Sequence, residues 1–230
     1  MQRSKINEII RQGDEFIRAF GYRLPPFANL TPSEMKARRA DMRGLIEARL
    51  GWDITDYGQG TFDELGLFLF TARNGSATDL AAGRGMLYAE KIMISRRDQL
   101  SPMHRHVVKA EDIINRGGGT LALKLFASQA DGVIDRDAPV SVPCDGVMRK
   151  LDAGGVLRLG AGESVTLLPG VWHAFWGEGG DVLIGEVSTV NDDLTDNVFE
   201  DAIPRFSGIE EDEEPYRLLV SDYQQWLKPD

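Results

Sequence analysis

The spacing of hydrophobic positions changes about a quarter of the way along the chain. In the first part, apolar side chains recur at three- and four-residue steps, as in Ile6, Ile9, Ile10 and Ile17. This spacing places them on one face of a helix. Thr31 opens a Thr-Pro-Ser-Glu sequence, in which threonine can cap a helix, proline suits its first turn, and glutamate completes a capping box. We therefore expect a helical N-terminal extension over residues 1–64.

From residue 65 the apolar positions occur in short or alternating runs. Glycine- and proline-rich segments separate them, as in Asn115–Gly119. Many short strands with turn signals at this spacing predict an antiparallel sandwich or barrel, which we place at residues 65–190. The runs that we predict as strands are Leu65–Ala72, Met86–Ser95, His104–Lys109, Thr120–Ser128, Val140–Val142, Gly155–Leu159, Ser164–Leu168 and Val182–Val187. Residues 191–230 become acidic, and we expect them to pack on the barrel.

Composition narrows the possible functions. Of 230 residues, 42% are hydrophobic and 27% charged, which is typical of globular proteins and excludes disorder as the main state. The net charge of −10 disfavours binding to nucleic acid or to an anionic membrane. One cysteine, Cys144, allows no internal disulfide, and the apolar run Leu65–Phe70 is too short to cross a bilayer. We therefore expect a cytoplasmic protein without nucleic-acid or membrane partners.

Two of the three histidines lie close together in a predicted strand. His104 and His106 point to the same face of that strand, because side chains alternate with a period of two. Two imidazoles on one face can hold one divalent ion. Glu111 follows five residues after His106, so a straight strand would place it on the opposite face. A turn or bulge near residues 107–109 would bring its carboxylate to the same ion.

The third histidine, His173, follows a Pro-Gly turn and leads into another predicted strand. A lone histidine is more often an ordinary polar residue of a sheet. Here, every histidine of the chain falls in one of two candidate ligand motifs. Three neutral imidazoles and one carboxylate suit Mn²⁺, Fe²⁺, Co²⁺, Ni²⁺ or Zn²⁺, and the ligand set alone does not choose among these metals.

These motifs resemble those of a known family. His104-x-His106-x4-Glu111, with Gly117 beyond it, resembles the first metal motif of the cupins, and the segment 162–173 resembles their second motif. Asp98 and Gly177 depart from the usual cupin residues. Further segments narrow the resemblance to the D-lyxose ketol-isomerase family. They are Leu24–Ala28, Glu90–Lys91, Lys109–Gly119, Gly185–Ser188 and Ile209–Glu213.

The resemblance implies a fold and an activity. The fold would be a mainly β, cupin-type antiparallel β-barrel (jelly roll) with an N-terminal α-helical extension. His104, His106, Glu111 and His173 would hold Mn²⁺. The enzyme would interconvert D-lyxose with D-xylulose, and often D-mannose with D-fructose, as a homodimer.

Moving a proton between C1 and C2 of a sugar needs proton carriers besides the metal. Lys109 shares strand parity with Glu111, so a turn that directs Glu111 to the metal also directs Lys109 inward. We expect a nearby cation to lower the pKa of Lys109 and make it a usable acid or base. Lys91 is a candidate for binding a sugar hydroxyl or assisting proton transfer, and a sheet-edge lysine is an equal alternative.

A carboxylate partner is also needed, and the family resemblance suggests one in the C-terminal segment. We favour Glu210 as the proton carrier, because it directly follows Ile209, and Glu211 as a substrate-binding residue. Glu186, in a predicted strand, is a reserve candidate. The aromatic side chains of Trp52, Trp172 and Phe175 are candidates for stacking on a sugar.

Three rival functions remain open. A cupin isomerase of phosphorylated sugars would need a phosphate clamp, and Gly117–Gly119 leads into a strand rather than into a helix. A metal-dependent dioxygenase would hold iron with the same four ligands and would consume oxygen. A non-catalytic sugar-binding or storage cupin would have no use for a buried cation site, so the four ligand residues beside Lys109 argue against it.

Overall fold

The N-terminal helix packs with one face against the sheet. The computed structural model describes residues 1–228, and α1 spans Arg3–Ala19. Ile6, Ile10 and Ile17 on this helix are fully buried in a cluster with aromatic residues of the sheet. Gly13 permits the close approach, because a Cβ at this position would lie 2.1 Å from the ring of Phe68. The helical face predicted from the isoleucine spacing is confirmed.

Three short helical turns follow α1. They are η1 (Pro26–Asn29), α2 (Pro32–Ala37) and α3 (Arg43–Glu47). The predicted capping box is present, because the Thr31 hydroxyl accepts a hydrogen bond from the Glu34 amide and the Glu34 carboxylate accepts one from the Thr31 amide. The apolar residues after this capping box, Met35, Met42, Leu45 and Ile46, do not lie on one continuous helix, since residues 38–42 make turns between α2 and α3.

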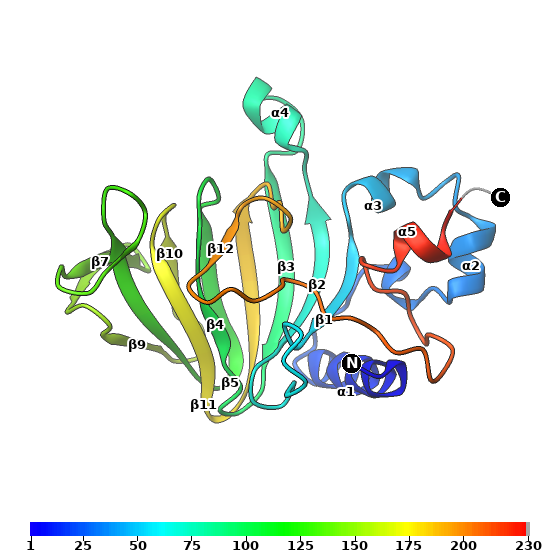
Figure 1. The fold of residues 1–230 in the computed structure, drawn as a ribbon, viewed down its shortest axis with the longest axis horizontal. Helices are drawn as coiled ribbons and strands as arrows, with labels where there is room; N and C mark the ends of the chain where they lie inside the picture. Colours follow the sequence, from blue (N-terminus) through cyan, green and yellow to red (C-terminus); the bar gives the residue numbers. More distant parts are fainter. Residues whose placement is uncertain (229–230) are drawn as a thin grey trace.

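A curled, mainly antiparallel sheet forms the rest of the molecule (Figure 1). Its strands run in the order β1-β2-β3-β11-β4-β12, and β5 pairs with β11, β10, β9 and β6. This architecture confirms the predicted mainly β class with an N-terminal helical extension. The strands are β1 (Gly51–Thr55), β2 (Leu67–Asn74), β3 (Tyr88–Ser95), β4 (Ser101–His106), β5 (Glu111–Ser128), β6 (Ile134–Asp135), β9 (Val156–Leu159), β10 (Ser164–Leu167), β11 (Trp172–Thr189) and β12 (Asn197–Phe199).

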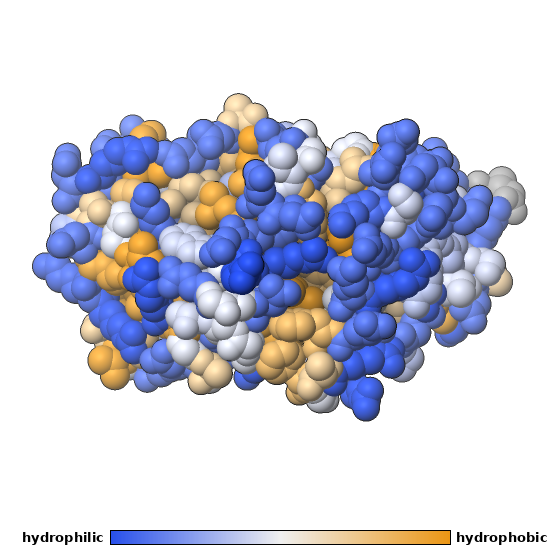
Figure 2. Space-filling view, turned by 90° about the horizontal axis from the view of Figure 1, so that it is seen from below, coloured by the Kyte–Doolittle hydropathy of each residue, from blue (hydrophilic) through white to orange (hydrophobic). Residues whose placement is uncertain are grey.

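Smaller elements complete the fold. A separate hairpin pairs β7 (Val140–Cys144) with β8 (Val147–Leu151). The helix α4 (Ala77–Ala82) projects from the connection between β2 and β3, and α5 (Tyr223–Trp226) lies among the N-terminal helices (Figure 1). Polar side chains cover most of the face in Figure 2, with apolar areas between them. No helix within residues 1–228 is long and apolar enough to cross a membrane.

Two features depart from the predicted division of the chain. The strand β1 lies inside the segment expected to be helical and pairs with β2, with Trp52 opposite Phe70. The C-terminal segment contacts two regions: β12 pairs with β4 of the barrel, and Glu210 forms a bridge with Gln2 beside α1.

The long strands β5 and β11 bring the barrel's parts together. They pair along most of their length, and β11 also pairs with β3 and β4. The pairing shifts register near Gly118, whose φ is +99° and where a Cβ would lie 2.1 Å from the carbonyl oxygen of Asp181. Leucines such as Leu121, Leu123 and Leu125 fill the barrel interior. The polar site described next lies beside this apolar core.

Candidate metal centre

The three histidines meet at the contact between two strands. His104 and His106 lie on β4, and His173 lies near the start of β11, directly opposite His104 in the strand pairing. One ring nitrogen from each lies within 4.8 Å of the others. The predicted convergence of His104, His106 and His173 is therefore present.

Glu111 joins this group from the first residue of β5. The chain turns between His106 and Glu111, as the phase argument required, so that the carboxylate faces the imidazoles. Its Oε1 lies 3.2 Å from His173 Nε2 and 3.4 Å from His106 Nε2. This oxygen is buried and makes no hydrogen bond of acceptable geometry. A buried oxygen without a hydrogen-bond donor has its lone pairs free to bind a cation.

Local backbone contacts orient two of the imidazoles. The Nδ1 of His104 lies 2.8 Å from the carbonyl oxygen of Pro102, and the Nδ1 of His173 lies 3.1 Å from that of Val171. Because a carbonyl only accepts, each Nδ1 carries the proton and each Nε2 keeps a lone pair. This arrangement is typical of histidines that bind metals.

Two of the imidazoles are held in the neutral form, which is the form that binds a metal. Burial, and then the neighbouring His173 and His106, lower the pKa of His104 well below its ordinary value. Burial, followed by the charge of Lys109, also lowers the pKa of His106. Three imidazoles and one carboxylate, whose buried Oε1 is unpaired, fit a divalent transition metal.

Two lysines and a second carboxylate extend the site. Lys109 Nζ lies 2.5 Å from Glu111 Oε2 and 2.9 Å from Glu186 Oε1. Lys91 Nζ lies 3.1 Å from the same Glu186 oxygen. We call Lys91, Glu186, Lys109 and Glu111 the ion-pair chain. All four are buried.

The opposite charges within the ion-pair chain determine the pKa values of its lysines and glutamates. Burial alone would lower the pKa of Lys109, but the charges and hydrogen bonds of Glu111 and Glu186 outweigh it and raise the pKa. With these two carboxylates beside it, Lys109 is an ammonium group at neutral pH. The lowering of its pKa by a bound cation stays a prediction. Burial alone would raise the pKa of Glu186, but Lys109 and Lys91 outweigh it and keep this group ionised.

Lys91 is an interior residue. It lies on β3 directly opposite Glu186 of β11, and its side chain is 2% exposed. Its ammonium group donates to Asn191 Oδ1 at 2.6 Å. The sheet-edge alternative is therefore excluded.

A cavity of about 40 Å³ adjoins these groups. Its lining includes Lys91, Lys109, Glu186 and the predicted ligands His104, His106 and Glu111. Of the three aromatic candidates for stacking on a sugar, Phe175 lines this cavity. Trp52 instead packs against Phe68 and Phe70, and Trp172 packs against Phe126.

The structure does not bring Glu210 and Glu211 to this cavity. Glu210 is exposed beside α1, where its backbone bonds to Met1 and Arg3. Glu211 Oε1 lies 2.7 Å from Arg3 Nη2. Both glutamates therefore contact the N-terminal extension. Of the three glutamates considered as substrate-handling residues, Glu186, the reserve candidate, is the one that lines the cavity.

Other residues of the site escaped the sequence analysis. They come from the loop after β1 and from the C-terminal segment: Tyr57, Asp193, Asn197, Phe199 and Arg205. The dense polar run at residues 191–196 was a possible signal. Such runs usually lie in solvent, so the sequence alone predicts an exposed segment here rather than part of the site.

Comparison with known proteins places this geometry in context. A family model described as D-lyxose isomerase matches residues 1–223. A D-lyxose/D-mannose isomerase of Serratia proteamaculans is 45% identical over 231 residues, covering 99% of this chain and all of the relative. A protein of the same name from Escherichia coli O157:H7 is 43% identical over 229 residues, covering 98% of this chain and all of the relative.

Solved structures show the same fold at low sequence identity. The L-ribose isomerase of Cellulomonas parahominis without ligand superimposes with a TM-score of 0.56 at 16% identity, covering 91% of this chain and 98% of that one. The same enzyme with L-psicose gives a TM-score of 0.57 at 17% identity, with the same coverage.

Proposed function

Because the chain belongs to the D-lyxose isomerase family, we propose that it is an aldose–ketose isomerase that converts D-lyxose to D-xylulose, and D-mannose to D-fructose. The observation that carries this proposal is the ion-pair chain directly beside the four candidate ligands. Ligands alone suit many reactions. An ammonium group and a charged carboxylate next to them suit proton transfer between adjacent carbons.

We assign the metal to His104, His106, Glu111 and His173, and we favour Mn²⁺ on the family resemblance. A divalent ion held there would supply a Lewis acid for the oxygens on C1 and C2 of the sugar.

The chain's own residues would move the proton. Glu186 is kept ionised by two lysines, so we assign it the removal of the C2 proton and its return at C1. Lys109 is an ammonium group beside it, so we assign it proton donation to the C1 oxygen as that oxygen becomes negative, and recovery of a proton from the C2 hydroxyl as the ketone forms. Lys91 would hold Glu186 in place and contact a hydroxyl. The cavity is small, so sugar hydroxyls would replace some of these side-chain contacts.

The cavity also favours an unphosphorylated sugar. Arg205 lines it, but its Nη2 lies 2.5 Å from Asp53 and 3.7 Å from Asp193. A guanidinium already facing two carboxylates is a poor partner for a phosphate dianion. This observation weighs against the phosphosugar isomerase. The homodimeric state and the cytoplasmic location remain predictions from the sequence.

The test uses metal-stripped protein with and without Mn²⁺, incubated with D-lyxose, D-mannose and mannose 6-phosphate. We expect ketose from the first two sugars only when Mn²⁺ is present. Turnover of mannose 6-phosphate alone would contradict the proposal. Oxygen consumption by iron-loaded protein, without ketose formation, would favour the dioxygenase instead.

A further inference from the structure

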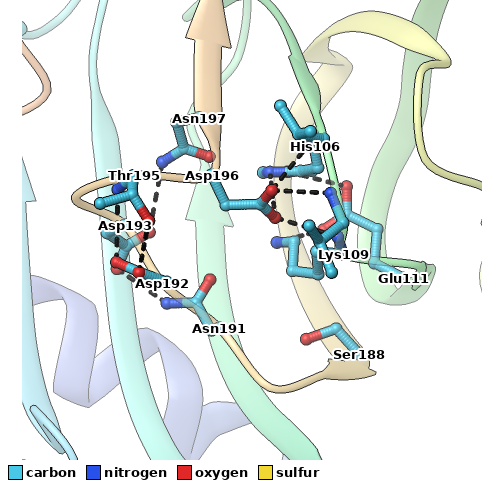
Figure 3. A network of polar contacts seen from close by, with 12 residues as sticks. His106, Lys109, Glu111, Ser188, Asn191, Asp192, Asp193, Thr195, Asp196 and Asn197 are labelled. Atoms are coloured by element: carbon cyan, nitrogen blue, oxygen red, sulfur yellow. Dashed lines mark hydrogen bonds and ion pairs between the residues drawn. The ribbon is translucent and has the colours of Figure 1, made fainter. Parts of the chain in front are cut away.

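One carboxylate binds three successive backbone amides beside the candidate metal centre. Asp196 lies in the strap, which we define as residues 190–196 between β11 and β12. Its Oδ1 accepts hydrogen bonds from the amides of Val107 at 2.9 Å and Val108 at 2.7 Å. Its Oδ2 accepts one from the amide of Lys109 at 3.0 Å (Figure 3).

The amides belong to the turn that sets the geometry of the site. This turn joins His106, the last residue of β4, to Glu111, the first residue of β5. It therefore has a predicted ligand at each end and carries Lys109 between them. Three N–H groups pointing at one anion form a charge-assisted contact, which is stronger than a bond between neutral groups.

The same carboxylate faces the one imidazole that lacks a backbone partner. The Nδ1 atoms of His104 and His173 each meet a carbonyl oxygen, whereas the buried Nδ1 of His106 has no hydrogen-bond partner within residues 1–228. Asp196 Oδ2 lies 3.8 Å from that atom, which is too long for a hydrogen bond but close enough for a charge to orient the ring. Figure 3 shows Asp196 pointing between His106 and Lys109.

We infer that Asp196 is a positioning residue of the metal centre: it fixes the turn 107–109 and thereby the placement of His106, Lys109 and Glu111. It acts through the backbone and through the His106 ring. The inference deepens the proposed function, on which only its kcat readout rests, since metal affinity is measured without any sugar.

The alternative explanation is that Asp196 only holds the strap in place and has no effect on the metal ligands. Asp192 provides a matched control, because it lies in the same strap and, among residues 1–228, its side chain bonds only within that strap. Asp192 accepts from the amides of Leu194 and Thr195 and from the Thr195 hydroxyl. Asp192→Asn thus weakens the strap without touching the turn.

The experiment compares Asp196→Asn and Asp192→Asn with the wild-type protein. Each metal-free protein is titrated with Mn²⁺ by calorimetry, its melting temperature is measured without metal, and kcat is measured with Mn²⁺ and D-lyxose. We expect Asp196→Asn to weaken Mn²⁺ binding about 10–100-fold, the usual effect of losing a group that orients ligands, and to lower kcat. Asp192→Asn should stay within about twofold of the wild type in Mn²⁺ affinity and in kcat, because it leaves intact the contacts that orient the ligands.

Equal Mn²⁺ affinities of the two variants would overturn the inference. If Asp196→Asn does not fold, Asp196→Glu replaces it, since it keeps the charge but moves the carboxylate by one methylene. Its Mn²⁺ affinity should then fall below that of Asp192→Asn, and equality would again overturn the inference. A wild-type protein that binds Mn²⁺ but forms no ketose would instead contradict the proposed function.

Discussion

At the scale of single residues, the ion-pair chain concentrates four buried charges that nearly cancel. Each ion costs several kcal/mol to remove from water, and mutual attraction recovers this cost only when the geometry is good. Glu186 meets both lysines, and Lys109 meets both glutamates. Such a group is weak evidence for stability. It is better explained as a set of charges held ready for a reaction.

The first prediction concerns Lys109. Lys109→Met keeps the apolar stem and removes the ammonium group, so the metal should still bind while kcat falls about 10²–10⁴-fold, the usual contribution of a general acid or base. The control is Lys150→Met, because Lys150 is exposed on β8. Metal content and kcat are measured on the same preparations. A kcat within about threefold of the wild type would leave Lys109 without a role in proton transfer.

The second prediction separates the two carboxylate candidates. Glu186→Gln should keep bound metal and lower kcat by about 10²–10⁴-fold, because the amide cannot take a proton from carbon. Glu210→Gln should change kcat less than about twofold, since Glu210 is exposed beside α1. Steady-state rates with D-lyxose decide between them. The reverse order of effects would restore Glu210 as the proton carrier.

These residues show how much of the site can be predicted from the sequence alone. The ligand group could be predicted because strand parity, a turn and a rare residue type are all local features. The choice of Glu210 rests on a family resemblance that points to the C-terminal segment and on its position directly after Ile209. Where that segment runs depends on its packing against α1, which no local pattern encodes. Glu186 reaches the site through the pairing of β11 with β3, which is a long-range contact.

At the scale of elements, the helix α1 is fastened to the C-terminal segment by one buried arginine. Arg3 is fully buried and bonds to Glu211 and to Asp222, at 2.7 and 2.8 Å for its Nη2. Asn7 on the same helix donates to the carbonyl oxygen of Glu214. This arrangement explains where the acidic run at residues 210–214 goes: much of it partners the first turns of α1.

The third prediction follows from this contact. Arg3→Met leaves buried Asp222 without its positively charged partner, so the free energy of unfolding should fall by about 3–5 kcal/mol, the usual cost of breaking a buried ion pair. Urea denaturation at pH 7 measures it. Lys5→Met, at a half-exposed position of the same helix, should cost less than about 0.5 kcal/mol. Equal stabilities of the two variants would contradict this account of α1.

The ion pair between Arg3 and Glu211 predicts how the stability of the fold changes with pH. The hydrogen bond from Arg3 lowers the pKa of Glu211 below its ordinary value. A carboxyl group of this kind stabilises the fold above its unfolded pKa, and the stabilisation is lost as pH falls through the folded value. The wild type should therefore lose stability below about pH 4.5 more steeply than Arg3→Met does.

At the scale of the whole molecule, the candidate metal centre joins separate strands of the curled sheet. Its ligands come from β4, from the start of β5 and from the start of β11. The mainly β class and the helical extension could be predicted, because both depend on hydrophobic period. The strand order could not, since β11 pairs with three different strands. That pairing depends on the register shift near Gly118, which only a backbone contact reveals.

The fourth prediction is that metal stabilises the whole fold. A ligand that binds only the folded state adds about 2.7 kcal/mol at a free concentration of 100 times its Kd. Removal of metal with a chelator should therefore lower Tm, and added Mn²⁺ should restore it. His173→Ala should shrink this shift without unfolding the metal-free protein. An unchanged Tm shift and full metal occupancy in His173→Ala would mean that the site is misassigned.

The central claim is that buried residues beside the metal move a proton between C1 and C2. The most direct measurement is conversion of D-lyxose by the Mn²⁺-loaded protein in D₂O, followed by NMR. Lys109 carries exchangeable protons and lies 2.9 Å from Glu186, so deuterium can reach the carrier carboxylate. We predict D-xylulose with deuterium at C1, and loss of both conversion and labelling in Lys109→Met. Conversion at the full rate with all hydrogen retained, as in a direct hydride shift, would contradict the account.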